Sequence, residues 1–170
     1  MTRYVALLRA VNVGGTGKLA MTELKAMCRA AGFADVETYV ASGNAVFTSD
    51  RNPPEVKLAL ETRLQAYFGK PAGVVLRTAP QMLAALQANP FGQHPGNRTV
   101  AIFLDAPPPP DALAHAKGLA GEEMRLGDRE IYVFYKSGMG GSKLRIPAAA
   151  DGTARNMNTV AALARMAAKS

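Results

Sequence analysis

The sequence predicts an α+β protein made of two halves, each an antiparallel sheet with helices packed on it. Three observations lead to this fold class. Residues 1–78 alternate as β-α-β-β-α-β, a tight hairpin joins their second and third strands, and residues 98–170 repeat most of that order. The hairpin is decisive, because a parallel nucleotide-binding sheet would place a helix between those two strands.

The first half opens with a strand over residues 4–11, which is apolar on both faces and therefore suits the centre of a sheet. A helix ending at Gly32 follows. Its apolar stripe consists of Leu24, Met27, Cys28 and Ala31. Because Cys28 lies on that stripe, we interpret it as a small core residue and not as a nucleophile.

Further strands are expected over residues 36–41, 45–48 and 73–77, the first two joined at Ser42-Gly43-Asn44. Pro53 and Pro54 open a second helix, which ends at Gly69. Its buried stripe is expected to be Val56, Leu60, Leu64, Tyr67 and Phe68. The resulting order is that of a ferredoxin-like, or α-β plait, half.

Residues 79–97 form a linking segment, in which Thr78 and Gln81 make a capping box for a helix over 82–88. The second half, 98–170, begins with a strand over 99–104 and a helix over 112–119. A hairpin over 123–126 and 130–135 and a last helix over 156–168 complete it. Its order is that of a second ferredoxin-like half whose last strand is not recognised.

Composition indicates a cytoplasmic protein with no membrane segment. No apolar run approaches the length of about 20 residues that a membrane helix needs, and the first residues lack the pattern of a secretory signal. A single Cys28 excludes an intrachain disulfide framework. The net charge of +7 indicates affinity for polyanions, although a purely solubilising surface charge would give the same number.

The glycine-rich stretch 12–18, Asn-Val-Gly-Gly-Thr-Gly-Lys, follows the first strand. Backbone N–H groups beside a Lys are suited to holding an anion. A P-loop is not predicted, because Asn12 and Leu19 stand where a glycine and a hydroxyl are required. A dinucleotide site is not predicted either, since the following hairpin contradicts the βαβ unit. We therefore expect no bound cofactor, and the glycines could serve turns alone.

Antiparallel topology gathers this loop, the 42–44 turn and the start of the fourth strand at one edge of the sheet. The residues expected there are Arg9, Asn12, Gly14, Gly15, Lys18, Ser42, Asn44 and Lys70. Cations, short polar side chains and backbone amides together predict an anion-binding rim. No carboxylate stands among them to act as a general base.

Other catalytic or binding features are sparse. His94 and His115 have no partner at metal-ligand spacing, so no metal site is predicted. Ser142 and Lys143, in a second glycine-rich stretch over 136–143, match no nucleophile motif. Tyr4 and Phe47 could stack RNA bases, but we interpret both as core residues. An active site assembled from distant residues remains open.

The polar run Arg155-Asn156-Met157-Asn158 exceeds what capping of the last helix requires. We expect Met157 to be buried, and we expect Arg155, Asn156 and Asn158 to serve the same rim. Arg155 and Asn158 would approach the 14–18 loop or the 42–44 turn. They would either brace those backbones or complete an anion site.

Several residue groups together resemble the bacterial family catalogued as domain of unknown function 1697. They are the strand around Arg9 with Asn12-Val-Gly-Gly15, Met21 with Leu24, Thr38-Tyr39 with Ser42-Gly-Asn44, and Arg155-Asn156 with Asn158-Thr159. Ala41 and Met157 depart from the pattern, which usually has Gln and an aromatic residue there. The resemblance implies a two-plait fold and no established activity.

Three functions are compatible with the sequence. The first is a binding module that holds a phosphate-bearing small molecule or nucleic acid at the glycine-rich basic edge. The second is an enzyme acting on a small anionic metabolite, with Arg9 and Lys18 as electrostatic stabilisers. The third is a structural or protein-interaction role without a ligand. The sequence does not indicate the oligomeric state.

Overall fold

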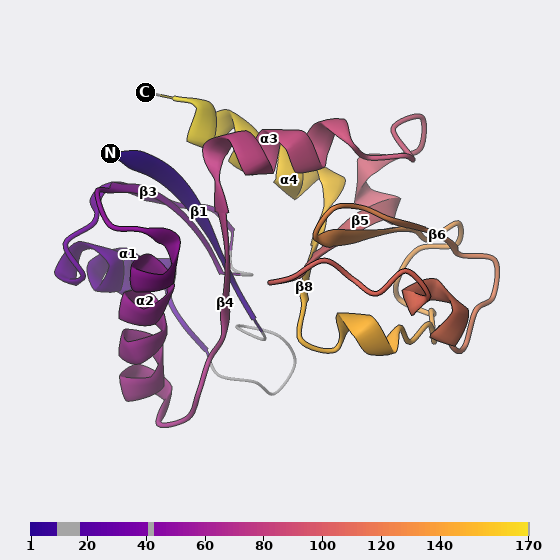
Figure 1. Ribbon diagram of the computed structural model, residues 1–170, viewed down its shortest axis with the longest axis horizontal. Helices are drawn as coiled ribbons and strands as arrows, with labels where there is room; N and C mark the ends of the chain where they lie inside the picture. Colours follow the sequence, from indigo (N-terminus) through magenta and orange to yellow (C-terminus); the bar gives the residue numbers. More distant parts are fainter. Residues whose placement is uncertain (10–17, 41–42, 170) are drawn as a thin grey trace. The chain divides into compact units, whose positions relative to one another are not determined.

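The computed structural model describes residues 1–9, 18–40 and 43–169, and the chain divides into two compact units (Figure 1). One unit contains Met1–Met82 with Leu163–Ser170, and the other contains Leu83–Ala162. The last residues of the C-terminal helix therefore fall in the first of these units. Each unit holds a four-stranded antiparallel sheet, which confirms the α+β class.

The first unit contains β1 (Thr2–Leu8), α1 (Met21–Ala30), β2 (Ala34–Thr38), β3 (Asn44–Ser49), α2 (Pro53–Phe68) and β4 (Val74–Thr78). Its strand order is β2-β3-β1-β4, with every neighbouring pair antiparallel. The predicted central position of the first strand is confirmed. The helix α3 (Ala79–Gln87) follows β4 directly, and reciprocal hydrogen bonds between Thr78 and Gln81 confirm the capping box.

Two details of the first unit differ from the prediction. The second strand was expected over residues 36–41, but β2 ends at Thr38, because the backbone at Val40 has a φ of 46° and leaves the extended conformation. Tyr67 was expected in the buried stripe of α2 and is 47% exposed. It lies one position off the stripe and packs edge-on against Phe68, which itself contacts the core.

The second unit contains β5 (Thr99–Phe103), β6 (Glu123–Leu126), β7 (Glu130–Phe134), β8 (Thr153–Asn156) and the start of α4 (Met157–Ala168). Three short 3-10 helices connect them: η1 (Gly96–Arg98), η2 (Ala112–His115) and η3 (Pro147–Ala149). The strand order β6-β7-β5-β8 repeats that of the first sheet. In each unit the first strand lies between the third strand and the last strand. The β6–β7 hairpin confirms the prediction.

The sequence prediction missed β8, which pairs antiparallel with β5. Its buried side chains are the polar residues Thr153 and Arg155, so the strand carries no alternation of apolar and polar residues. The last strand that seemed missing from the second half is therefore present. It lies directly before the C-terminal helix.

The predicted helix over residues 112–119 is wrong, because only the single turn η2 forms. The chain extends after His115, where the backbones of Lys117 and Arg145 exchange two hydrogen bonds of 2.8 Å. Gly118 follows with a φ of 75°, and a Cβ there would lie 2.2 Å from the Lys143 carbonyl oxygen. This backbone pairing overrides the helix propensity of the Ala- and Leu-rich segment.

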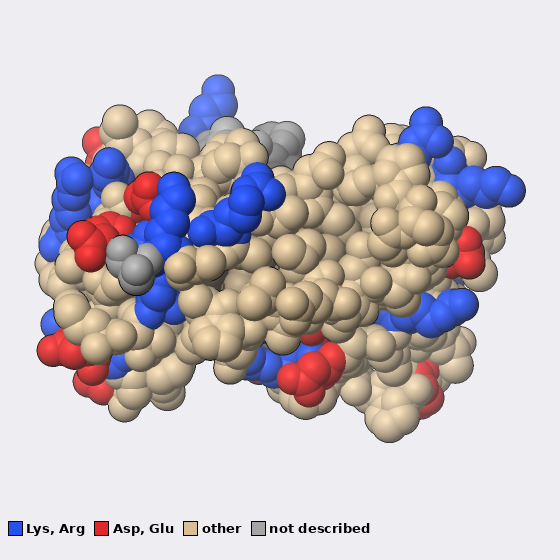
Figure 2. Space-filling model, turned by 90° about the horizontal axis from the view of Figure 1, so that it is seen from above, with Lys and Arg blue, Asp and Glu red and all other residues tan. Residues whose placement is uncertain are grey.

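Basic residues that are scattered along the sequence gather at the surface. Figure 2 shows a group of Lys and Arg side chains at the left, over the first unit, with acidic side chains beside them, and further Lys and Arg side chains at the right. Arg3, Arg29 and Lys169 line one groove of that unit together with Asp35 and Glu37. The surface there carries both signs of charge and is not a purely cationic patch.

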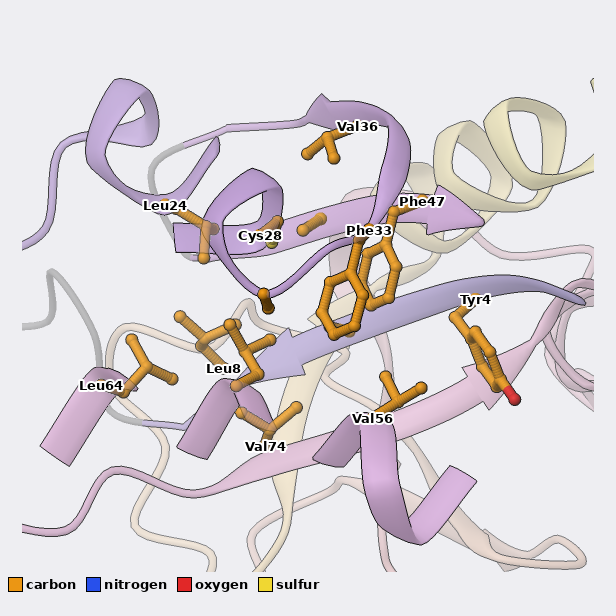
Figure 3. Close-up of a cluster of buried hydrophobic side chains, with 14 of the residues drawn as sticks. Tyr4, Leu8, Leu24, Cys28, Phe33, Val36, Phe47, Val56, Leu64 and Val74 are labelled. Carbon is orange, nitrogen blue, oxygen red and sulfur yellow. The ribbon is translucent and has the colours of Figure 1, made fainter. Parts of the chain in front are cut away.

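The core of the first unit lies between its sheet and the helices α1 and α2 (Figure 3). Phe33 and Phe47 stack inside it, with ring centroids 4.3 Å apart and planes 6° from parallel. The Tyr4 hydroxyl donates to the Arg51 carbonyl oxygen at 2.7 Å. Tyr4, Phe47 and Cys28 are all buried, which confirms that they are core residues, and burial raises the pKa of the Cys28 thiol to about 12.

The helix α2 offers a matched test of this core. Leu60 is fully buried, whereas Leu58 is 66% exposed. We expect Leu60→Ala to lower the free energy of unfolding by about 2–5 kcal/mol through lost contacts and a cavity. We expect Leu58→Ala to change it by less than about 0.5 kcal/mol. Urea unfolding of both variants measures this, and equal effects would contradict the assigned face of α2.

Candidate functional site

The end of β1 lies between the residues that precede β3 and β4. The Leu8 amide donates to the Gly43 carbonyl, and the Arg9 amide donates to the Gly73 carbonyl, both at 2.9 Å. The chain therefore leaves β1 at the edge where β3 and β4 begin, as antiparallel topology predicts. The other predicted residues of this edge, Asn12, Gly14, Gly15 and Ser42, lie outside the described residues.

Gly73 has no side chain, and this leaves room for the Arg9 side chain to lie close to the sheet. A Cβ on Gly73 would lie 3.0 Å from Arg9 Cδ and 3.1 Å from a terminal guanidinium nitrogen. The Arg9 side chain is half-buried, so its aliphatic part packs against the backbone. Lys18 and Lys70, which the sequence also assigned to this rim, are exposed.

The turn before β3 is braced from inside by Asn44, which is fully buried. Its Nδ2 donates to the Tyr39 carbonyl oxygen at 2.8 Å, and the Tyr39 amide donates to the Asn44 carbonyl at 3.0 Å. Val40 within this turn has a φ of 46°, which is unfavourable for a β-branched residue. Strain of this kind persists only where surrounding contacts hold it, and the Asn44 hydrogen bonds fix Tyr39, the residue directly before Val40.

The polar run that ends β8 and begins α4 uses its side chains within the second unit. Asn156 Oδ1 accepts a hydrogen bond from the Thr159 amide at 2.9 Å and so caps α4. Asn158 packs against Gly96, where a Cβ would lie 2.2 Å from its Oδ1. Met157 is buried, as predicted.

Arg155, the cation of this run, is buried. Its guanidinium donates to the Thr153 hydroxyl at 2.6 Å and to the Ala154 carbonyl at 2.9 Å. Burial lowers the pKa of Arg155 to about 10. The proposed approach of Arg155 and Asn158 to the 14–18 loop or the 42–44 turn stays a prediction, because residues 14–17 and Ser42 lie outside the described residues.

A groove of about 900 Å³ in the first unit is not the site that the sequence predicted. Arg3 is one of the residues that line it. The Arg3 guanidinium donates to the Asp35 carbonyl at 2.9 Å and to the Glu37 carboxylate at 3.0 Å. The same guanidinium reaches the Met166 carbonyl at 3.4 Å. Because these contacts occupy Arg3, we interpret it as a residue that ties β2 and the C-terminal segment to β1.

Each of the two histidines contacts another side chain of the second unit. The His94 ring stacks on Phe134, with centroids 3.8 Å apart, and His115 contacts Asp111 at 3.1 Å. Among the described residues, no three His, Cys, Asp or Glu side chains gather into a possible metal site. No described helix combines the length and the apolar character needed to cross a membrane.

The fold thus defines a protein with two α+β units, each built on a four-stranded antiparallel sheet with the same strand order. The family model of DUF1697, a protein family of unknown function, matches residues 1–132, and the chain belongs to that family. The structure of the conserved bacterial protein SP0830 from Streptococcus pneumoniae is similar, with a TM-score of 0.82 and 27% identity over 99% of each chain. No curated protein matches the sequence.

Replacing Arg155 tests whether its hydrogen bonds within β8 stabilise the fold. We expect Arg155→Ala to lower the free energy of unfolding by about 1–3 kcal/mol, because the Thr153 hydroxyl and the Ala154 carbonyl lose a buried donor. Arg165→Ala, which removes an exposed cation from α4, is the matched control and should have little effect. Denaturant unfolding of the two variants decides this, and an Arg155→Ala protein as stable as its parent would contradict a stabilising role for these two hydrogen bonds.

Proposed function

We propose that this protein is a cytoplasmic binding module that holds a phosphate-bearing ligand, a nucleotide or a nucleic acid, at the glycine-rich edge of its first sheet. One observation carries the proposal. The amides of Leu8 and Arg9 bond to Gly43 and Gly73, so the end of β1, which leads into the glycine-rich loop, adjoins the starts of β3 and β4. Arg9 contributes a cation at that point, and Lys18 follows the loop in sequence.

The resolved pKa shifts among the described residues do not point to a general acid or base. The shifts resolved among them raise the pKa of Cys28 and Tyr135 and lower the pKa of Glu122 and Arg155. None of these changes brings a group to a pKa near neutrality, where general acid–base catalysis works best.

We also infer that both units are ferredoxin-like plaits. The shared strand orders, β2-β3-β1-β4 and β6-β7-β5-β8, support this inference, since a central first strand beside a hairpin is the plait arrangement. We also propose that the chain is organised as a ferredoxin-like half over residues 1–78, a linking helix and loop over 79–97, and a second plait-like half with the C-terminal helix over 98–170.

Thermal unfolding with candidate ligands tests the proposed function. ATP, glucose 6-phosphate and a single-stranded oligonucleotide are suitable probes, because each carries phosphate on a different scaffold. A probe present at 100 times its dissociation constant should stabilise the protein by about 2.7 kcal/mol. The stabilisation should weaken as salt is added.

A charge-matched pair of variants locates the site. We expect Lys18→Ala to weaken binding of the stabilising probe about tenfold, which corresponds to about 1.4 kcal/mol for one charged contact. Lys25→Ala on α1 removes the same charge and should leave affinity unchanged. Calorimetric titration measures both. Equal losses in the two variants, or no stabilisation by any probe, would contradict the proposal.

A further inference from the structure

The start of β4 is held by two side chains of α2, Lys57 and Glu61. The Val74 amide donates to Glu61 Oε2 at 2.9 Å, and Lys57 Nζ donates to the Val74 carbonyl oxygen. The same Glu61 oxygen accepts from Lys57 Nζ at 2.8 Å. Both backbone polar groups of Val74, the first residue of β4, are therefore bonded to one ion pair.

The two backbone groups of Val74 point away from β1. The Arg9 amide donates to the Gly73 carbonyl, so Gly73 faces β1, and alternation along an antiparallel strand turns the N–H and C=O of Val74 to the other side. Because β4 is the last strand in the sheet order, no strand of the described residues pairs with it on that side. The ion pair supplies the hydrogen bonds that a neighbouring strand would supply, and it fixes β4 from its outer side.

The order of the two charges along α2 indicates a role outside the helix. A pair spaced four residues apart stabilises a helix more when the Glu precedes the Lys, and here Lys57 precedes Glu61. Their side chains are 33% and 29% exposed, so both are substantially covered by the protein. The contact with Val74 accounts for this arrangement better than the stability of α2 does.

The residue directly before Val74 determines the room available to Arg9. A Cβ at Gly73 would lie 3.0 Å from Arg9 Cδ and 3.1 Å from a terminal nitrogen, and its three nearest atoms all belong to the Arg9 side chain. Because this contact is so close, a small shift of the start of β4 changes where the Arg9 guanidinium lies. The hydrogen bonds of Lys57 and Glu61 to Val74 therefore also fix the position of Arg9.

We propose that Lys57 and Glu61 are positioning residues of the anion site at the edge of the first sheet, and that they act by fixing Val74 and Gly73 against Arg9. The inference rests on the proposed function, because that function assigns Arg9 to the site. The pair carries no net charge, so its effect on an anion comes from the position of Arg9 and not from an added positive field.

The ligand-free protein tests the positioning role. Arg9 Nε is buried, so its N–H resonance is shielded from exchange with water and reports the surroundings of that side chain. Loss of the signal in Arg9→Lys assigns it. We expect Glu61→Ala to move the resonance, since the Val74 amide loses its acceptor, whereas Glu61→Gln keeps an oxygen there and should leave it in place. An unmoved resonance in Glu61→Ala would overturn the proposal.

Titration with ATP separates position from charge. Glu61→Ala should weaken ATP binding about tenfold, as expected for one misplaced charged contact, and Glu61→Gln should restore it. If the carboxylate acted only through its charge, both variants would bind ATP more tightly, and that result would overturn the proposal. Asp50→Ala, which removes an exposed carboxylate directly after β3, is the control and should leave the affinity unchanged.

Gly73→Ala tests the link between Val74 and Arg9. Gly73 has no positive φ, and the added methyl group would meet only the flexible Arg9 side chain, so the variant should fold. We expect it to move the Arg9 Nε resonance and to weaken ATP binding about tenfold. Gly92→Ala, whose methyl group would lie 4.0 Å from the Asn89 carbonyl oxygen, should change neither. A Gly73→Ala protein with the resonance and affinity of its parent would refute the link.

These measurements distinguish failure of the positioning role from failure of the proposed function. If ATP does not bind the parent protein, the Arg9 resonance still decides the positioning role, and the remaining probes decide the proposed function. If ATP binding depends on Lys18 but not on Glu61, the proposed function stands and the positioning role is refuted.

Discussion

The pairing of β1 with β3 and β4 is the constraint on which the first unit depends. Because β1 is hydrogen-bonded along both sides, its residues are fixed in register with two strands that are distant in sequence. One face of β1 then meets α1 and α2 in a single core cluster. The same pairing brings Leu8 and Arg9 against Gly43 and Gly73, so the geometry of the edge is a consequence of the sheet. The second unit repeats the constraint with β5 between β7 and β8.

Much of this fold could be predicted where local chemistry and burial agree. The helix α2 has a capping box at Asn52 and a left-handed Gly69 at its end, and both signals are visible in the sequence. The missed strand β8 and the wrongly predicted helix over residues 112–119 have a common cause. β8 buries Thr153 and Arg155, and η2 stops where Lys117 pairs with Arg145, so tertiary contacts decide both segments against their local pattern.

The candidate site was predictable in outline but not in the roles of its residues. Antiparallel topology predicted which strand ends meet, and the described ends do meet. It could not predict that Asn44 would be fully buried with its amide used to brace Tyr39, or that Asn156 would cap α4. Those roles depend on how deeply each side chain is buried and on which backbone groups it reaches, and the spacing of residues along the sequence does not determine either.

Mass spectrometry of small molecules released from the natively purified protein tests the central claim most directly. The account predicts that a phosphate-bearing molecule accompanies the folded protein and that Lys18→Ala loses it while Lys25→Ala retains it. A retained molecule without phosphate, or one kept equally by both variants, would contradict the claim that the glycine-rich edge of the first sheet is an anion-binding site.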